Sequence, residues 1–340
     1  MSKLKFAILG CGRISYKHIE AMINNEADCV PVALCDLKEE RAEDRKKQYL
    51  ESFPNTIINV YTDYKKMLEE EDIDVVVIAT ESGYHGKHAI DVLNSGAHVM
   101  IEKPMALNLD EIDEINKLAD EKNLKVCVSH QNRFNRPIQK LKRALEEGRF
   151  GKLINGTARI LWTRDQHYYE LAPWRGTKAL DGGTLMNQCI HNIDLLQWMM
   201  NSKVVSVKSE LGTFLRDIEM EDFGAILLRF ENGAVGLIEG SACVYPKNLE
   251  ETLSIFGETG TAVIGGLAVN EIKTWDFADK KYYDNPETKD DIDNVYGNGH
   301  TPLYHDFIEA INNDGKPLID GYEGKKAVEI ILRAYEESGF

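Results

Sequence analysis

The sequence predicts a two-domain protein, with an α/β domain built on a parallel sheet and an α+β domain with a large, mostly antiparallel open sheet. The chain has 340 residues, a length typical of about two domains. In its first part, short apolar runs alternate with helical segments, as in a parallel sheet that is buried on both faces. After about residue 130, long strand-like stretches follow one another, which predicts a mostly antiparallel sheet.

The first domain, residues 1–125, is predicted to alternate strands and helices. Strands are expected at 5–10, 30–36, 57–61, 74–80, 97–103 and 124–130. Helices are expected at 13–25, 38–52, 63–71, 83–96 and 108–123. The connections are long enough for right-handed crossovers, so we expect the strands to run parallel.

The second domain, residues 126–340, is predicted to be rich in long strands. They are expected at 152–164, 203–215, 224–230, 234–244 and 251–257, with a hairpin turn at the Asn-Gly pair of 232–233. Helices are expected at 183–200, 300–313 and 323–339. The last two helices can pack back on the first domain. The acidic stretch 276–293 is expected to be an exposed loop.

Composition excludes some classes of function. There are 40 Lys and Arg against 56 Asp and Glu, a net charge of −16, which disfavours nucleic-acid binding. An anionic ligand would therefore require a locally basic pocket. The six cysteines are scattered without metal-ligand spacing, so no metal site is predicted. Without a signal-peptide pattern or a membrane-spanning run, we expect a cytoplasmic protein that does not enter a membrane.

The segment GCGRIS at 10–15 places two glycines between a predicted strand and a predicted helix. Gly10 permits a tight turn, and Gly12 leaves room for a pyrophosphate near the free N–H groups of Arg13 and Ile14. Asp36 ends the second strand, where a carboxylate binds the ribose hydroxyls of NAD and repels the extra phosphate of NADP. Ser15 stands where the dinucleotide-binding pattern prefers a third glycine. The alternative is a glycine turn used only for packing.

Lys103 ends another predicted strand, between Glu102 and Pro104. Ligands of open α/β sheets bind beyond the carboxyl ends of the strands, so Lys103 is expected on the same rim as GCGRIS. Pro104 restricts the backbone beside it. The alternative is a surface lysine that is only solvated.

The predicted helix 183–200 carries three polar residues on an otherwise apolar surface. Asn187, His191 and Asp194 are spaced at i, i+4 and i+7, so they are expected to share one face. Buried polar groups need partners, and a histidine that is satisfied within the core is the competing interpretation.

Together, AILGCGRIS, the strand-end EKP and the GG…H…D helix resemble the Gfo/Idh/MocA oxidoreductases over nearly the whole chain. The resemblance implies a Rossmann domain and an NAD-dependent dehydrogenase of sugars or inositols. It implies that Lys103 and His191 are the catalytic pair, and it leaves open which of them takes the proton. The predicted cofactor residues, some from the GCGRIS pattern and others from this resemblance, are Gly10, Gly12, Arg13, Ile14, Asp36, Thr80, His85, Glu102, Lys103 and Gln131.

One position departs from many members of the family. They have an aspartate four residues before the histidine, and this chain has Asn187. An amide cannot take a proton, but it can orient a hydroxyl or the cofactor. Histidine is a suitable general base without a carboxylate, and a lysine can stabilise alkoxide charge. Asn187 is therefore kept with Lys103 and His191 as a predicted catalytic residue.

A narrower group shares this departure. The segments QNRFN (131–135), PWRGT (173–177) and DGGTLMNQ (181–188) resemble the WlbA/WbpB-type enzymes. These oxidise C3 of UDP-N-acetyl-glucosaminuronic acid to a 3-keto sugar. Arginines and aromatic residues are expected around such an anionic substrate. The predicted substrate residues are Arg133, Arg159, Trp162, Arg164, Tyr168, Tyr169, Trp174, Arg175, Asn187, His191, His300 and Tyr304.

The resemblance also implies partners. Some relatives keep NAD bound and re-oxidise NADH with 2-oxoglutarate. Family members often use the open sheet for contacts between subunits, so a homo-oligomer, dimer or tetramer, is expected. Two alternatives stay open: a dehydrogenase of another sugar or of inositol, and a sensor that binds dinucleotide and sugar without turnover.

Overall fold

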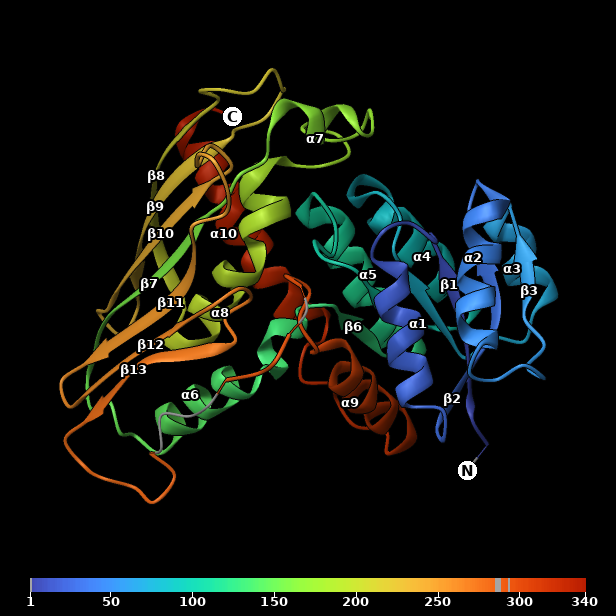
Figure 1. The fold of residues 1–340 in the computed structure, drawn as a ribbon, viewed down its shortest axis with the longest axis horizontal. Coiled ribbons are helices and arrows are strands. Elements are labelled where there is room, and N and C mark those ends of the chain that lie inside the picture. Colours follow the sequence, from blue (N-terminus) through green and yellow to red (C-terminus); the bar gives the residue numbers. More distant parts are fainter. Residues whose placement is uncertain (1, 285–288, 293) are drawn as a thin grey trace. The chain divides into compact units, whose positions relative to one another are not determined.

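The computed structural model describes residues 2–284, 289–292 and 294–340, which fall into two compact units (Figure 1). The first unit comprises residues 1–130 and 300–325, and the second comprises 131–299 and 326–340. This division differs from a single cut at residue 125. The strand at 126–128 pairs with the first sheet, and the helix that begins at His300 packs on the first helix of the chain, so both belong to the first unit.

The first unit contains a six-stranded parallel sheet in the order β3-β2-β1-β4-β5-β6, which confirms the predicted fold class. Its strands are β1 (Leu4–Leu9), β2 (Cys29–Cys35), β3 (Asn59–Tyr61), β4 (Val75–Ile78), β5 (His98–Ile101) and β6 (Val126–Val128). All four residues of β4 are buried, because helices cover both faces of a parallel sheet. The carboxyl ends of β1, β2, β4 and β5 carry the predicted cofactor residues of this unit.

Six helices surround this sheet in the described part of the chain, and two of them begin at a residue whose side chain caps the helix. They are α1 (Ser15–Asn24), α2 (Glu39–Leu50), α3 (Tyr64–Glu70), α4 (His85–Ser95), α5 (Leu109–Lys122) and α9 (His300–Asn312). The side chain of Asp63 caps α3, and that of Asn108 caps α5 by accepting from the Glu111 N–H at 2.9 Å. Gly96, with φ of 93°, ends α4 in the left-handed conformation.

The second unit contains a seven-stranded sheet in the order β13-β12-β11-β7-β10-β9-β8. Its strands are β7 (Leu153–Leu161), β8 (Val204–Gly212), β9 (Phe223–Phe230), β10 (Val235–Ser241), β11 (Glu250–Gly257), β12 (Gly260–Gly265) and β13 (Glu271–Phe277). Neighbours are antiparallel except for β7 and β10, so the predicted mostly antiparallel sheet is confirmed.

The sequence patterns do not single out β12, β13 or the helix α6 (Arg136–Glu146). Two glycines bound β12 and weaken its strand pattern, and β13 is polar on one face. The first two residues of the predicted loop at 276–293 are part of β13, so this loop begins later than expected. Residues 285–288 and 293 of that stretch lie outside the described part of the chain.

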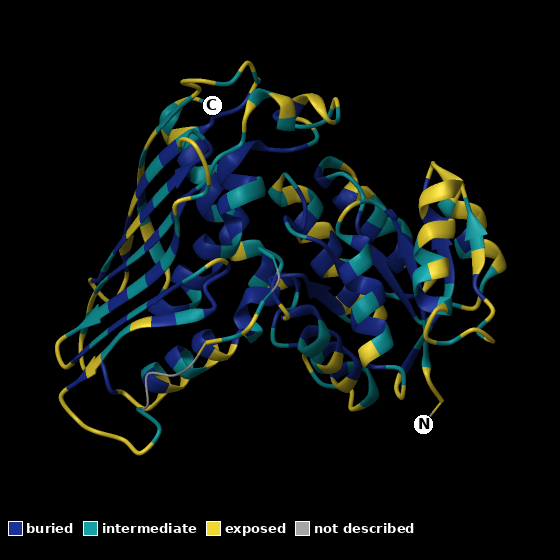
Figure 2. Cartoon of the chain, in the orientation of Figure 1, coloured by how far each residue is buried: buried dark blue, intermediate teal, exposed yellow. Residues whose placement is uncertain are grey.

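Helix α8 (Ile190–Met200) lies across one face of this sheet (Figure 1). A Cβ at Gly156 of β7 would meet the side chains of Leu196 and Met200, so helix and strand are in close contact. The strands alternate between buried and more exposed residues (Figure 2), as a sheet with one covered face requires. On the other face, Leu227 and Leu237 oppose each other in register and are 48% and 44% exposed.

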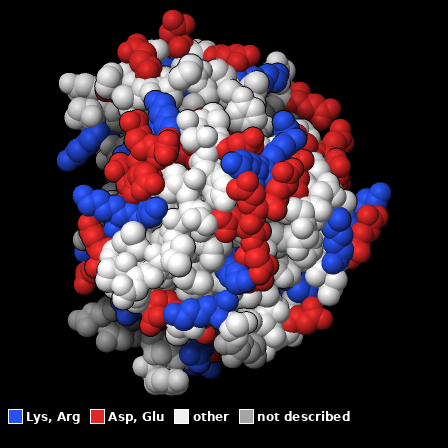
Figure 3. All heavy atoms as spheres, turned by 90° about the vertical axis from the view of Figure 1, so that its right-hand side faces the viewer, with Lys and Arg blue, Asp and Glu red and all other residues white. Residues whose placement is uncertain are grey.

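Acidic and basic side chains are interspersed on the face that Figure 3 presents. On this face neither sign of charge forms a continuous patch. Among the described residues, none of the helices combines the length and the apolar character that a membrane span requires.

Candidate functional site

The glycine turn between β1 and α1 has the geometry that a dinucleotide needs. Gly10 has φ of 95°, and a Cβ there would lie 2.5 Å from the carbonyl oxygen of Ala79. At Gly12, by contrast, a Cβ would meet no heavy atom within 4 Å, so the backbone borders open space. Ser15 is tolerated at the third position because its hydroxyl donates to the Gly12 carbonyl at 2.7 Å. Arg13 is exposed and Ile14 is half-buried on this turn.

Asp36 is held beside this turn at the end of β2. Its carboxylate accepts from the Cys11 N–H at 2.8 Å and from the Lys38 N–H at 2.9 Å. One oxygen also lies 3.9 Å from the guanidinium of Arg41. Carboxylate and open glycine turn therefore lie next to each other, as ribose and pyrophosphate require. The Asp36 carboxylate, as an acceptor for ribose hydroxyls, and the open turn at Gly12 together fit NAD.

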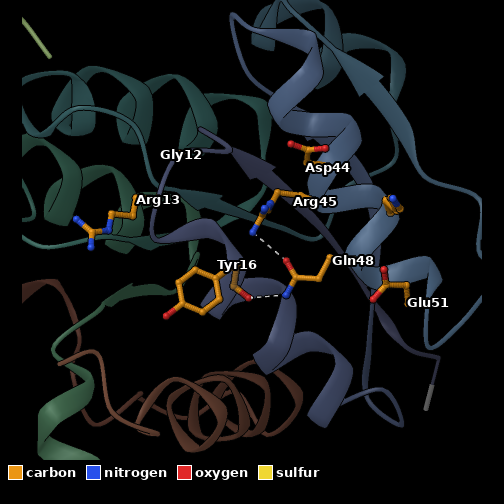
Figure 4. Close-up of a pocket in the computed structure, with 8 residues that line it drawn as sticks. Gly12, Arg13, Tyr16, Asp44, Arg45, Gln48 and Glu51 are labelled. Carbon is orange, nitrogen blue, oxygen red and sulfur yellow. Dashed lines mark hydrogen bonds between the residues drawn. The ribbon is translucent and has the colours of Figure 1, made fainter. Parts of the chain in front are cut away.

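A pocket of about 590 Å³ adjoins Gly12 between α1 and α2 (Figure 4). Arg45 of α2 points into it, and its guanidinium donates to the amide oxygen of Gln48 at 3.0 Å. Gln48 in turn donates to the main-chain oxygen of Tyr16 at 3.0 Å, which fixes both side chains. Arg45 adds a cation beside the glycine turn that sequence reasoning missed, because α2 reads as a solvated charged helix.

At the ends of β4 and β5, His85 holds two main-chain segments together. Its ring nitrogens lie 3.0 Å from the carbonyl oxygen of Thr80 and 2.7 Å from that of Pro104. Burial lowers the pKa of His85, although both carbonyls favour the protonated ring. His85 thus positions the backbone on either side of the rim, where Lys103 is half-buried.

Glu102 points into the core of the first unit. Its Oε1 lies 3.0 Å from Nε2 of His18 in α1 and 3.6 Å from Nε2 of His300 in α9. Burial alone would raise the pKa of Glu102, but its hydrogen bond to His18 and the nearby ring of His300 outweigh burial and hold this pKa well below the usual range. Glu102 therefore ties the strand end of Lys103 to the helix that follows the glycine turn.

His300 and Tyr304 were predicted to contact substrate, and the structure places both in this core. The Tyr304 hydroxyl lies 3.0 Å from Nδ1 of His18, and its ring stacks on Phe6 with centroids 5.5 Å apart. Tyr304 is fully buried and His300 is 2% exposed. Their contacts position His18 and Glu102, and neither side chain is presented to a ligand here.

In the second unit, the predicted helix at 183–200 has an irregular start. A π-helical turn, η3 (Leu185–Cys189), precedes α8 and carries Asn187, and His191 lies in the first turn of α8. Such turns are frequent at functional sites. The Asn187 amide donates to the carboxylate of Asp181, which also accepts from the Gly176 N–H at 2.6 Å. Asn187 and His191 are half-buried.

Asp194, the third member of the predicted stripe, belongs to a different environment. Both its oxygens accept from Arg133, at 2.7 and 2.6 Å, and neither side chain is exposed. Arg133 also lies over the ring of Trp198 at 4.7 Å. This buried pair holds η2 (Gln131–Phe134) against α8. Arg133 is thus placed in the core and not at a ligand surface, and Gln131, which is also buried, lies in the same second-unit segment.

Of the arginines and aromatic residues predicted to contact substrate between positions 159 and 175, most do come together. The ring of Tyr168 lies between two guanidinium groups, 5.2 Å from that of Arg164 and 4.3 Å from that of Arg175. Arg164 also stacks over Trp162 at 4.8 Å, and Arg175 over Trp174 at 4.6 Å. Cations stacked on aromatic rings in this way form a rigid, positively charged surface.

Two predicted members do not join this surface. Arg159 lies on the sheet face opposite α8, where it donates to Glu239 at 2.8 Å and to Glu250 at 3.0 Å. Its position follows from strand alternation, because Ala158 and Ile160 on either side face inward. Tyr169 is buried under the turn at Gly176, and this burial raises its pKa.

Two residues that sequence reasoning did not assign stand out around η3. Gln188 accepts from Arg164 at 2.7 Å and donates to the Tyr168 hydroxyl at 3.1 Å. Glu221 is fully buried and accepts from the Leu185 N–H at 2.7 Å and from the Tyr335 hydroxyl at 3.0 Å. Burial raises the pKa of Glu221 to about 8. Gln188 follows Asn187 directly and could have been found by its place in the motif, but nothing in the sequence marks Glu221.

Comparisons with known proteins agree with this geometry. Residues 4–130 match the model described as "Oxidoreductase family, NAD-binding Rossmann fold", and residues 138–263 match "GFO/IDH/MocA C-terminal domain". A curated relative, the myo-inositol 2-dehydrogenase of Thermotoga maritima, is 25% identical over 348 residues, which is 96% of each chain.

Two solved structures are similar over nearly the full length. The WlbA dehydrogenase of Bordetella pertussis, in complex with NADH and UDP-GlcNAcA, has a TM-score of 0.90 and 35% identity, covering 100% of this chain and 96% of that one. The WlbA dehydrogenase of Chromobacterium violaceum, in complex with the same two molecules, has a TM-score of 0.89 and 36% identity, covering 99% and 94%.

Proposed function

Because this chain belongs to the Gfo/Idh/MocA family of NAD-binding oxidoreductases, we propose that it oxidises C3 of a UDP-N-acetyl-hexosaminuronic acid to the 3-keto sugar. The two WlbA dehydrogenases, crystallised with UDP-GlcNAcA, support the nucleotide sugar as substrate. The Thermotoga relative supports the wider class of cyclic polyols.

The pair Arg164 and Arg175 is the observation that carries the choice of an anionic sugar. Within the described residues, neither guanidinium forms an ion pair with a carboxylate. Arg133, Arg149 and Arg159 each do, in a protein with 56 acidic residues. Two arginines held by stacking and by neutral partners are suited to bind a carboxylate or a diphosphate.

The proposed chemistry assigns one role to each group. Removal of the C3 hydroxyl proton requires a base, and stabilisation of the alkoxide requires a cation or donor; His191 and Lys103 supply these functions. When bound, NAD supplies the acceptor for the hydride from C3. Asn187, held by Asp181, orients a hydroxyl by hydrogen bonding. We also propose that 2-oxoglutarate re-oxidises the NADH and that the protein acts as a homo-oligomer.

The test incubates the purified protein with UDP-GlcNAcA and NAD⁺, with and without 2-oxoglutarate, and follows both sugars and acids by mass spectrometry. We expect a nucleotide sugar lighter by two hydrogens, and 2-hydroxyglutarate where 2-oxoglutarate was added. The variants Lys103→Ala and His191→Ala should lose this product while still binding NADH. Sugar oxidation at the wild-type rate in either variant would show that the catalytic assignment is wrong.

A second candidate is a dehydrogenase of inositol or of another uncharged sugar, which the Thermotoga relative favours. It predicts turnover of free polyols and no use of the UDP-sugar. The same assay with myo-inositol and free sugars distinguishes the two, and absence of turnover with all of them, while NADH binds, would favour a sensor.

A further inference from the structure

Gln188 lies where the positively charged surface meets the turn that precedes the predicted catalytic histidine. Its amide oxygen accepts from Nη2 of Arg164 at 2.7 Å. Its amide nitrogen donates to the Tyr168 hydroxyl at 3.1 Å and to the Asn187 side-chain oxygen at 3.2 Å. The Gln188 side chain thus contacts both a candidate anion-binding arginine and Asn187, its neighbour in η3.

These contacts continue as a directed chain of hydrogen bonds from a cation to an anion. Arg164 donates to Gln188, Gln188 donates to Asn187, and Asn187 donates to the carboxylate of Asp181. Asp181 is 2% exposed, and its second oxygen is held by a main-chain N–H. The charge of Arg164 is therefore connected to a buried carboxylate through two neutral amides, and among the described residues no carboxylate contacts its guanidinium directly.

The orientation of Arg164 is further restricted by its neighbours. It stacks over Trp162 and Tyr168, and Nη1 donates to the Thr163 carbonyl at 2.7 Å. Asn248 adds a longer contact at 3.4 Å. Both Arg164 and Gln188 are half-buried, so the guanidinium is ordered and still reachable. An ordered cation loses little entropy when it binds a planar anion.

We propose that Gln188 is a specificity-determining and positioning residue that couples recognition of a negatively charged group by Arg164 to the placement of Asn187. The inference rests on the proposed function and deepens it, because the substrate class is a sugar that carries a carboxylate. Arg164 binds the carboxylate, and Gln188 links Arg164 to Asn187 in the turn before His191. A neutral sugar leaves Arg164 unused.

The test compares two pairs of sugars, UDP-GlcNAcA against UDP-GlcNAc and glucuronate against glucose. In each pair the first member, called charged below, carries a carboxylate on the sugar ring, and the second, called neutral, carries a hydroxymethyl group there; UDP-GlcNAc keeps its diphosphate. Binding to the NADH-loaded protein is measured by calorimetry, and kcat and KM are measured wherever turnover occurs. Wild-type protein should prefer the charged member. Gln188→Glu should form an internal pair with Arg164 and weaken binding of the charged sugar by about tenfold or more, with little effect on the neutral one.

Gln188→Met removes both the acceptor and the donor without adding charge. We expect kcat for the charged sugar to fall more than kcat for the neutral one, because Asn187 loses its link to Arg164. The matched control is Gln166→Glu on α7 (Gln166–Glu170), a nearby glutamine bonded only to the main chain of Asp217 among the described residues. It makes the same chemical change without touching Arg164 and should keep wild-type preference.

The outcomes separate the inference from the function on which it rests. Preference for glucuronate over glucose without use of UDP-GlcNAcA would reject the nucleotide sugar and support the role of Gln188, provided that Gln188→Glu abolishes the preference. Equal effects of both Gln188 variants on charged and neutral sugars, or a wild-type protein that does not prefer the charged member of either pair, would overturn the inference.

Discussion

Gly10 and Gly12 are two residues apart, yet an added Cβ would have opposite consequences at the two positions. At Gly10 it would overlap the Ala79 backbone at 2.5 Å, in a conformation with φ of 95°. At Gly12 it would enter open space, which is where the pyrophosphate of a dinucleotide is expected. The fold therefore requires a glycine at position 10, and we expect that only a bound dinucleotide requires one at position 12.

We predict that Gly10→Ala lowers the free energy of unfolding by about 2 kcal/mol or more, because backbone cannot move aside at low cost. Gly12→Ala should unfold like the wild type and bind NADH at least about tenfold more weakly. Chemical denaturation and fluorescence titration with NADH measure the two effects. Normal NADH binding by a stable Gly12→Ala protein would show that the pyrophosphate does not approach this turn.

At the scale of elements, the buried carboxyl group of Glu221 forms a hydrogen bond with the first residue of the π-helical turn η3. Glu221 holds the Leu185 N–H at the start of the turn, and Tyr335 of α10 (Gly321–Ser338) donates to the same carboxyl group and to the Gly182 carbonyl. Gly183 is needed here, because a Cβ would overlap the Glu221 side chain. The start of the helix that carries His191 thus depends on the buried carboxyl group of Glu221.

This group makes stability depend on pH. Burial raises the pKa of Glu221 to about 8 from a usual value of 4.5, so the folded state keeps a proton that the unfolded state releases between these values. Its stabilising contribution is full below pH 4.5 and is lost as pH rises through about 8. Glu221→Gln should therefore gain stability relative to wild type across this window, by a few kcal/mol at most.

Urea denaturation at several pH values between 4.5 and 9 measures the Glu221 effect. Glu219→Gln, at an exposed position two residues away, is the control and should follow the wild-type profile. Parallel profiles for wild type and Glu221→Gln would mean that Glu221 is ionised in the folded protein.

At the scale of the whole molecule, the uncovered face of the second sheet is the surface that we expect to contact a second copy of the chain. Leu227 and Leu237 lie side by side on β9 and β10, about half exposed, while Arg159 and Glu239 on the same face neutralise each other. Apolar pairs flanked by self-compensated charges are suited to a contact between copies of the chain. This is the surface on which the expected homo-oligomer depends.

We predict that Leu227→Lys with Leu237→Lys converts an oligomeric wild type into monomers, because buried lysines would face each other without counterions. Size-exclusion chromatography with light scattering reports the mass. Ile57→Lys, at an 81% exposed apolar residue of the first unit, should leave the mass unchanged. A wild-type protein that is already monomeric would refute the predicted oligomer.

The sequence by itself determined the parallel sheet, the glycine turn and the place of Asp36. These depend on local patterns: apolar runs, turn residues and a fixed spacing between strand and helix. It also identified the residues around Tyr168 as a group, because they are close together in the chain. It did not reveal β12, whose bounding glycines blur the strand pattern.

Only the tertiary structure decided the partners of the charged residues. Arg133, Arg159 and Arg164 look alike in sequence, yet the first pairs with Asp194 in the core, the second with Glu239 on the far sheet face, and the third with the Gln188 amide. These partners lie 61, 80 and 24 residues away, so sheet register and helix packing bring them together. The physical reason is that local propensity shapes the backbone, whereas burial and counterions are set by segments remote in the chain.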